Sequence, residues 1–168
     1  FDLEEVKKKE ISKNFKISSS EIRNEILKGN ISIVNMMLGY KYFIKGEIIK
    51  GDGIGKKLDF PTANIKIRND GKILPSDGVY AGYAMLSNKK INGMINIGNR
   101  PTLEGKERRV EMNLFNYSEN IYGKEMKIFF IKRIRDEQKF KTLDDLSKQL
   151  KKDKLKTIKI IENEEIRN

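Results

Sequence analysis

The stretch GVYAGYAMLSNKKINGMINI, residues 78–97, decides the fold. It contains two segments rich in apolar and β-forming residues, 78–86 and 91–97, and the polar pair Ser87 and Asn88 between them is typical of a turn. The connection is too short for a crossover helix, so the two segments are predicted to pair as antiparallel strands. Four further segments of this kind lie at residues 42–49, 62–67, 108–115 and 124–131.

These six segments predict a mainly β fold. Clusters of Gly, Asn and Asp, such as residues 69–71, separate them without a helix-length crossover. An open sheet of this size would expose two edge strands, and closing the sheet removes both edges. We therefore expect a small six-stranded antiparallel barrel. A chain of 168 residues with 38% hydrophobic content fits one such domain with a small appendage.

Helical segments flank the predicted barrel. Residues 18–29 begin with a capping-box pattern and end in a glycine, and residues 31–39 are predicted to form a second helix with Ser32 as its cap and Gly39 as its end. Residues 141–153 carry a second capping box and leucines spaced for one face of a helix. The sequence thus predicts a short N-terminal helical appendage and a C-terminal helix that flanks or plugs the barrel.

The composition excludes several kinds of chemistry. The chain has no histidine and no cysteine, so it contains no Ser/His triad, no His- or Cys-ligated metal and no thiol nucleophile. A net charge of +11, concentrated between residues 41 and 140, favours nucleic acid, a membrane surface or a phosphorylated small molecule as partner. The chain has no membrane-length apolar run and begins at Phe1 without a start Met or a signal peptide. We therefore expect a cytoplasmic piece of a longer protein.

A glycine-rich loop follows the first predicted strand. Glycine stands at every second position, Gly51, Gly53 and Gly55, and the cations Lys56 and Lys57 come next. Glycines let a backbone approach a ligand closely with its N–H groups turned inward, and lysine balances phosphate charge. The loop is a candidate phosphate site, although a plain hairpin turn would have the same composition.

Thr62 and Asn64 follow this loop in the segment FPTAN, residues 60–64. In an extended strand they point to the same face, where a hydroxyl and an amide oxygen converge beside the glycine loop. Two neutral oxygens suit a hydrated Mg²⁺ whose negative ligands come from nucleotide phosphates. The alternative is an edge strand in which Asn64 caps a turn.

Glu111 is a carboxylate within an otherwise apolar-patterned strand. Since the chain has no His and no Cys, proton abstraction would need a carboxylate, Lys or Tyr, and Glu111 is the best-placed candidate. The alternative is a solvated residue on the outer face of the sheet. The segment with Arg133, Arg135 and Phe140 joins the last strand to the C-terminal helix, and its pattern favours surface ion pairing around a helix start.

Taken together, these segments resemble the riboflavin kinase module of the bacterial bifunctional riboflavin kinase/FAD synthetase family. The resemblance runs from about Ser18 to about Asp153. The chain departs from the family at three positions: Asp59 stands where the family usually has Gly, Lys56 where it has Arg, and Asn113 where it has His. The motifs that carry it, in the family's order, are ISSSEIR at 17–23, MLG at 37–39, the glycine-rich loop at 51–55, FPTANI at 60–65, GVYA at 78–81, NIGNRPT at 96–102, VE at 110–111, IYGK at 121–124 and IRDEQKF at 134–140.

The resemblance implies a six-stranded Greek-key barrel with a C-terminal helix. It also implies an ATP:riboflavin 5′-phosphotransferase, which moves the γ-phosphoryl group of ATP to the terminal ribityl hydroxyl of riboflavin and yields FMN and ADP. Thr62 and Asn64 would hold Mg²⁺ with the β and γ phosphates, and residues 51–57 would cover the nucleotide. Glu111 would be the general base. The flavin pocket would be bordered by Arg135 and Phe140.

The resemblance further implies the domain organisation. Residues 1–40 would be the helical end of an adenylyltransferase (FAD synthetase) domain, and residues 41–168 the kinase barrel with its C-terminal helix. The nucleotidyl-transfer core, with its His-containing motif, would lie before Phe1. FMN adenylyltransferase activity is therefore expected only of a longer parent protein.

Two alternatives to the kinase come from other functional classes. A basic, OB-like barrel could bind nucleic acid without catalysis if aromatic residues such as Tyr80, Tyr83 and Phe115 were exposed, and its affinity would fall steeply with salt. A catalytically silent assembly or regulatory module is the second alternative. For the kinase, we expect riboflavin and ATP as partners and neither a membrane nor a nucleic acid.

Overall fold

A computed structural model describes residues 17–51, 53, 55–102 and 105–166. Six strands form a closed barrel in the order β1-β2-β5-β4-β3-β6, and all neighbouring strands are antiparallel. Since β6 returns to lie beside β3 after β3, β4 and β5 have paired in sequence, these four strands form a Greek key. The predicted barrel is confirmed. Its strands are β1 (Phe43–Ile49), β2 (Ala63–Ile67), β3 (Gly78–Leu86), β4 (Lys89–Thr102), β5 (Gly105–Leu114) and β6 (Glu125–Arg135).

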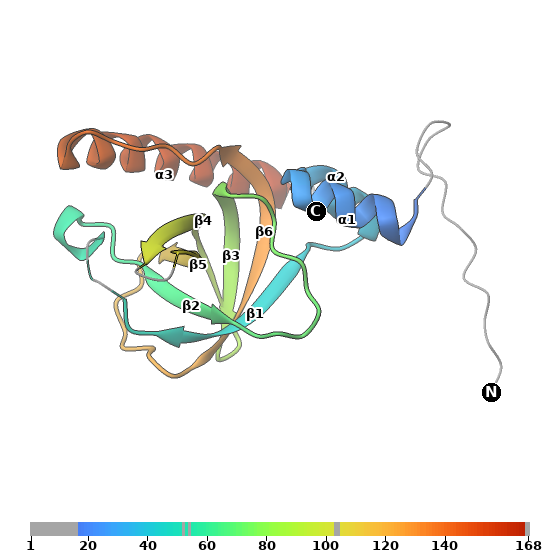
Figure 1. The fold of residues 1–168 in the computed structure, drawn as a ribbon, viewed down its shortest axis with the longest axis horizontal. Coiled ribbons are helices and arrows are strands. Elements are labelled where there is room, and N and C mark those ends of the chain that lie inside the picture. The colour runs from blue at the N-terminus through green and yellow to red at the C-terminus, as the bar shows by residue number, and fades with distance from the viewer. Residues whose placement is uncertain (1–16, 52, 54, 103–104, 167–168) are drawn as a thin grey trace.

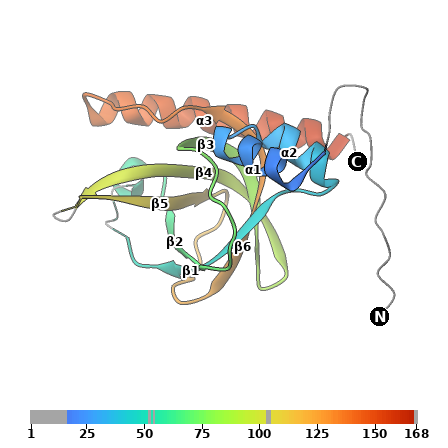
Figure 2. The same cartoon turned by 45° about the vertical axis from the view of Figure 1, so that its right-hand side comes forward.

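Three α-helices accompany the barrel: α1 (Ser19–Lys28), α2 (Ile31–Leu38) and α3 (Leu143–Ile166). Figure 1 shows α3 lying along one side of the barrel, and Figure 2 shows α1 and α2 beside its C-terminal end. A short 3₁₀ helix, η1 (Gly55–Leu58), lies between β1 and β2. No helix within the described ranges is long and apolar enough to cross a membrane.

The predicted caps of α1 and α3 are present, whereas the cap predicted at Ser32 is wrong, because α2 begins at Ile31 after Asn30, which makes no side-chain cap hydrogen bond. The Ser18 hydroxyl accepts a hydrogen bond from the backbone N–H of Glu21 at 3.2 Å, and Thr142 accepts one from the N–H of Asp145 at 3.1 Å. Helix α3 runs well beyond the predicted end at residue 153 because no Gly or Pro interrupts it and because its later turns still bury side chains against the barrel.

Alternating side chains separate the inside of the barrel from its outer face. Inward residues such as Ile44, Ile95 and Ile128 are completely buried and form the core. The helical pair joins the same core through Ile26, Ile31 and Val34 of α1 and α2. Residues 17–40 therefore pack into one end of the barrel, while the assignment of residues 1–40 to a preceding domain stays a prediction.

Asn35 of α2 fastens the helical pair to the barrel. Its amide nitrogen donates to the backbone carbonyl of Phe130 at 2.9 Å, and its amide oxygen accepts from the N–H of Tyr42 at 2.7 Å. The pairing of β3 with β6 shifts register between Ala81 and Gly82, close to Phe130. The Asn35 side chain therefore forms hydrogen bonds with backbone groups that the irregular ladder does not pair.

Two local predictions need correction. The strand predicted to end at residue 97 continues as β4 to Thr102 and pairs with β5 as far as Thr102 and Gly105. Tyr80, which the nucleic-acid alternative requires to be exposed, is completely buried, and its hydroxyl donates to the backbone carbonyl of Ser76 at 2.6 Å. Its ring points into the barrel because the alternation of β3 puts it on the inward face.

Candidate active site

Cross-strand register sets three predicted site residues, Asn64, Glu111 and Arg135, in one row on the outer face of the barrel. Asn64 of β2 pairs with Glu111 of β5, and Glu111 pairs with Asn96 of β4. The row continues through Val79 of β3 to Arg135 of β6. Directly opposed residues in an antiparallel sheet lie about 5 Å apart at their Cβ atoms, so these side chains share one small patch of surface.

Helix α3 covers this row and encloses a cavity of about 310 Å³. Leu146 and Leu150 from the N-terminal half of the helix form an apolar wall opposite the polar row. A few converging polar groups facing an apolar wall are typical of a small-molecule site. The residues predicted from the sequence that line this one cavity are Gly53, Gly55, Thr62, Asn64, Glu111, Arg135 and Phe140.

Thr62 and Glu111 contact each other inside the cavity. The Thr62 hydroxyl oxygen lies 3.4 Å from Oε2 of Glu111, a long hydrogen bond in which the hydroxyl donates. Glu111 is half-buried, so its carboxylate can face a substrate on one side and Thr62 on the other. Asn64 is 8% exposed and completes the trio.

The glycine-rich loop lies against the same trio. Gly51 packs so close to the amide of Asn64 that a Cβ at this position would collide with it, which explains why the position needs glycine. The backbone N–H of Phe60 donates to the carbonyl of Gly55 at 2.9 Å and joins the loop to the FPTAN segment. Lys56 and Lys57 belong to η1, but their side chains, like residues 52 and 54, lie outside the described part.

Arg135 binds a partner that the sequence pattern did not reveal. Its Nε and a terminal nitrogen lie 2.9 and 2.8 Å from Oδ2 of Asp153, which is 2% exposed in the middle of α3. The Arg135 guanidinium also lies over the ring of Phe140, 5.7 Å from its centroid. Arg135 thus fixes α3 and Phe140 against the barrel at the edge of the cavity, and its contact with flavin stays a prediction.

Sequence reasoning gave no site role to four polar residues of the cavity: Asn96, Asn113, Glu137 and Gln138. Asn96 stands beside Glu111 in the transverse row, and only the β4–β5 register reveals this. The Glu137 carboxylate lies over Gly98, in the space that a Cβ there would occupy. Gly98, the glycine of the NIG motif, was the one feature of the sequence that could have indicated this close approach.

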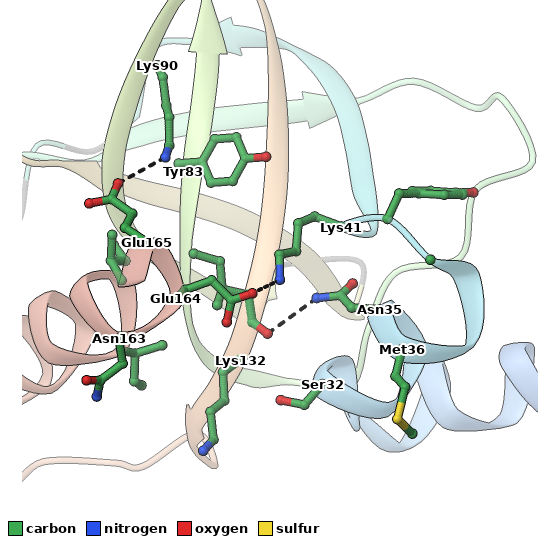
Figure 3. A pocket seen from close by; sticks show the side chains of 15 residues that line it. Ser32, Asn35, Met36, Lys41, Tyr83, Lys90, Lys132, Asn163, Glu164 and Glu165 are labelled. Carbon is green, nitrogen blue, oxygen red and sulfur yellow. Dashed lines mark hydrogen bonds and ion pairs between the residues drawn. The ribbon is translucent and has the colours of Figure 1, made fainter. Parts of the chain in front are cut away.

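A second, larger cavity of about 800 Å³ contains none of the predicted site residues. Figure 3 shows it between α2, the barrel wall and the last turns of α3, where Lys41 pairs with Glu164, and Lys90 lies 3.1 Å from Glu165. These ion pairs satisfy most of its charged groups and tie the end of α3 to the barrel. Since size alone does not define a site, we place the chemistry in the smaller cavity, where Thr62 and Glu111 converge.

Together, these observations define a small closed β-barrel with a small-molecule site, in which polar groups of the strands face an apolar wall from α3. The family model described as riboflavin kinase (Flavokinase) matches residues 38–161. The chain therefore belongs to the riboflavin kinase family.

Curated relatives agree with this family. The chain is 42% identical over 151 residues to the bifunctional riboflavin kinase/FMN adenylyltransferase of Bacillus subtilis, covering 88% of this chain and 48% of that protein. The protein of the same name from Escherichia coli is 35% identical over 141 residues, covering 83% and 44%. The chain spans about half the length of these curated relatives.

Two solved structures share the fold. One from Streptococcus pneumoniae, titled as a macrolide-efflux protein, has a TM-score of 0.82 and 35% identity, covering 87% of this chain and 48% of that one. Riboflavin kinase from Trypanosoma brucei has a TM-score of 0.52 and 23% identity, covering 71% and 79%, which supports the fold alone. The first title differs from the names of the curated relatives, which agree with the family model.

Proposed function

We propose that this chain transfers the γ-phosphoryl group of ATP to the terminal ribityl hydroxyl of riboflavin and forms FMN and ADP. The observation that supports this most directly is the convergence of the Thr62 hydroxyl, the Asn64 amide and the Glu111 carboxylate in one cavity beside a glycine-rich loop. Phosphoryl transfer needs alignment, charge stabilisation and a proton acceptor rather than covalent help from the protein.

The donor set of the cavity fits a hard divalent cation. Mg²⁺ prefers oxygen ligands and keeps few protein ligands when phosphates supply the negative charge. The Thr62 hydroxyl and the Asn64 amide oxygen would hold it beside the β and γ phosphates. When bound, it would neutralise charge that develops on the transferring phosphoryl group.

Glu111 acts as the general base in this proposal. The ribityl oxygen forms a bond to the γ phosphorus, the bond from that phosphorus to the β–γ bridging oxygen breaks, and the hydroxyl proton passes to the Glu111 carboxylate. Leu146 and Leu150 of α3 limit the access of water to the acceptor side of the cavity. Arg135 and Phe140 would border the flavin on that side.

The charge of the chain is consistent with a phosphorylated substrate, and the three aromatic residues named for the nucleic-acid alternative do not favour it. Tyr80 is buried, Tyr83 stacks on Phe129 with centroids 4.7 Å apart, and Lys154 lies over Phe115. These rings therefore offer little free surface for stacked bases. For a longer parent protein, we propose an additional FMN adenylyltransferase activity, the second function in the names of the curated relatives.

Incubation of the purified chain with riboflavin, ATP and Mg²⁺ tests the function, with FMN and ADP measured by chromatography. Glu111→Gln should lower turnover by about 10² to 10⁴-fold, because a positioned base contributes about that much, and riboflavin binding should remain. Glu119→Gln, an exposed substitution of the same kind, is the control. A Glu111→Gln variant with wild-type turnover would reject the role of this carboxylate.

A further inference from the structure

Asn113 of β5 bridges the two parts of the candidate site. Its amide nitrogen donates a hydrogen bond to the backbone carbonyl of Pro61 at 2.7 Å, and the residue is 7% exposed. A carbonyl can only accept a hydrogen bond, so the amide must turn its nitrogen toward Pro61. Asn113 shares the outer face of β5 with Glu111, two residues away.

The bond lies where the backbone ladder stops. Strand β2 pairs with β5 from Ile65 to Ala63, which stands opposite Met112, and the pairing ends there. Continuing the register would set Thr62 opposite Asn113, but Thr62 lies outside the strand and Pro61 has no N–H to donate. The Asn113 side chain therefore supplies the hydrogen bond that holds the segment against β5 one step beyond the ladder.

Thr62 depends on this bond for its position. It lies between Pro61, which Asn113 holds, and Ala63, where β2 begins, and its hydroxyl reaches Glu111. On its other side the segment is joined to the glycine-rich loop through the bond from Phe60 to Gly55. Without the amide, the three residues before β2 would keep the bond from Phe60 to the loop and the long hydrogen bond from Thr62 to Glu111, which is the contact that needs to be held in place.

We propose that Asn113 is a positioning residue, which acts through Pro61 to hold the Thr62 hydroxyl at the proposed phosphate and metal position, facing Glu111. The inference rests on the proposed kinase function and adds to it a residue outside the Thr62, Asn64 and Glu111 trio. It predicts an effect on the nucleotide side of the reaction, because the carbonyl that accepts this bond belongs to Pro61, the neighbour of Thr62.

The test compares Asn113→Leu, which keeps the size but loses the donor, with Asn113→His, whose ring N–H can still donate to the carbonyl. We expect Asn113→Leu to raise the KM for ATP and lower kcat by about tenfold or more, because small displacements of aligned groups have effects of that order. The KM for riboflavin should change less than about twofold, and Asn113→His should restore most of the activity. Asn163→Leu, an exposed substitution at the far end of α3, is the matched control.

A double-mutant cycle with Thr62→Val separates positioning from general damage. In the wild-type background, Asn113→Leu should weaken the binding of Mg·ADP. If Asn113 acts through Thr62, the same substitution should change the affinity for Mg·ADP by less than about threefold, and by less than in the wild type, when Thr62 is already replaced by Val. An equally large loss of Mg·ADP affinity in both backgrounds would overturn the inference. Wild-type kinetics for Asn113→Leu would overturn it as well. If Asn113→Leu does not fold, Asn113→Ser replaces it, because its hydroxyl is too short to reach Pro61.

The two proposals fail in different ways. A wild-type chain that forms no FMN would reject the proposed phosphoryl transfer. In that case calorimetry with Mg·ADP decides the role of Asn113, which is supported if Asn113→Leu weakens binding at least about fivefold and Asn113→His does not. Equal affinities in all three proteins would overturn it.

Discussion

At the scale of single residues, the site combines side chains that the sequence suggested with partners that it did not. Thr62, Asn64 and Glu111 were recognisable because a hydroxyl, an amide and a carboxylate stand out in β-patterned segments. Asn113 was noted only as a departure from the family pattern, because its acceptor is a backbone carbonyl 52 residues earlier in the chain. Every residue has a backbone carbonyl, so the residue types do not show which carbonyl will accept a given hydrogen bond.

Asp59 has a backbone conformation that explains why the resembled family usually has glycine there. Its φ is 59°, in the left-handed region that glycine tolerates at no steric cost. We predict that Asp59→Ala is less stable to urea than Asp59→Gly by about 1 to 2 kcal/mol, because a Cβ is strained at this φ. At Glu162, an exposed residue within α3, the order should reverse, with Ala more stable than Gly by about 1 kcal/mol. The same order at both positions would contradict the argument.

At the scale of elements, the two ends of α3 serve different purposes. Its N-terminal half walls the candidate active site, and Asp153 in the middle binds Arg135 of β6. Its last turn is held by Lys41 and Lys90 through Glu164 and Glu165, which offsets the unfavourable placement of acidic residues at a helix C-terminus. These contacts hold the middle and the last turn of α3 against the barrel, along one side of which the helix lies in Figure 1.

Removing Asp153 should be costly because it leaves the Arg135 guanidinium, 15% exposed, without its carboxylate. We predict that Asp153→Ala lowers the free energy of unfolding by about 3 to 5 kcal/mol, the usual cost of breaking a buried pair from one side. Asp144→Ala breaks the exposed pair with Lys148 on the same helix and should cost less than about 1 kcal/mol. Urea unfolding of both variants measures the two losses. Similar losses in the free energy of unfolding would show that the buried pair contributes no more to stability than the exposed pair.

At the scale of the whole molecule, the barrel and the helical pair form one core. Ile31 and Val34 of α2 are buried with barrel residues, and Asn35 bonds to the backbone of β6. Tyr42, at the start of β1, is buried at this junction and donates its hydroxyl proton to the carbonyl of Ile73 at 2.7 Å. The stability of the whole fold therefore depends on the protonation state of this hydroxyl.

Burial raises the pKa of Tyr42 from 10.0 to about 12. Between these values the unfolded chain loses the proton while the folded chain keeps it, so stability is complete below pH 10 and falls as the pH rises toward 12. Two pKa units correspond to about 2 to 3 kcal/mol. We predict that Tyr42→Phe, though less stable at neutral pH, shows a shallower loss of stability over this window in urea titrations.

Tyr122→Phe, which removes a hydroxyl from a residue that is 60% exposed, is the control for Tyr42→Phe and should follow the wild-type curve. Parallel curves for wild type and Tyr42→Phe between pH 10 and 12 would show that this hydroxyl does not couple to folding. The comparison of slopes removes the contribution of other groups that titrate in the same range, because they are common to both proteins.

The sequence by itself determined the six strands, the flanking helices and the caps of α1 and α3, because hydrophobic period and capping residues are local properties of the chain. Strands β1, β2, β3 and β6 begin and end within a few residues of their predicted bounds, whereas β4 and β5 extend into a hairpin whose polar residues resemble a turn. Motif order also indicated the family and the Thr62, Asn64 and Glu111 trio.

Only the tertiary structure decided which residues share the site. The register of β2, β5 and β4 sets Asn96 beside Glu111, the course of α3 brings Asp153 to Arg135, and the end of a ladder gives Asn113 its acceptor. These contacts join segments far apart in the chain, and they depend on strand register and helix placement. Register follows from packing across the whole barrel, which no local pattern encodes.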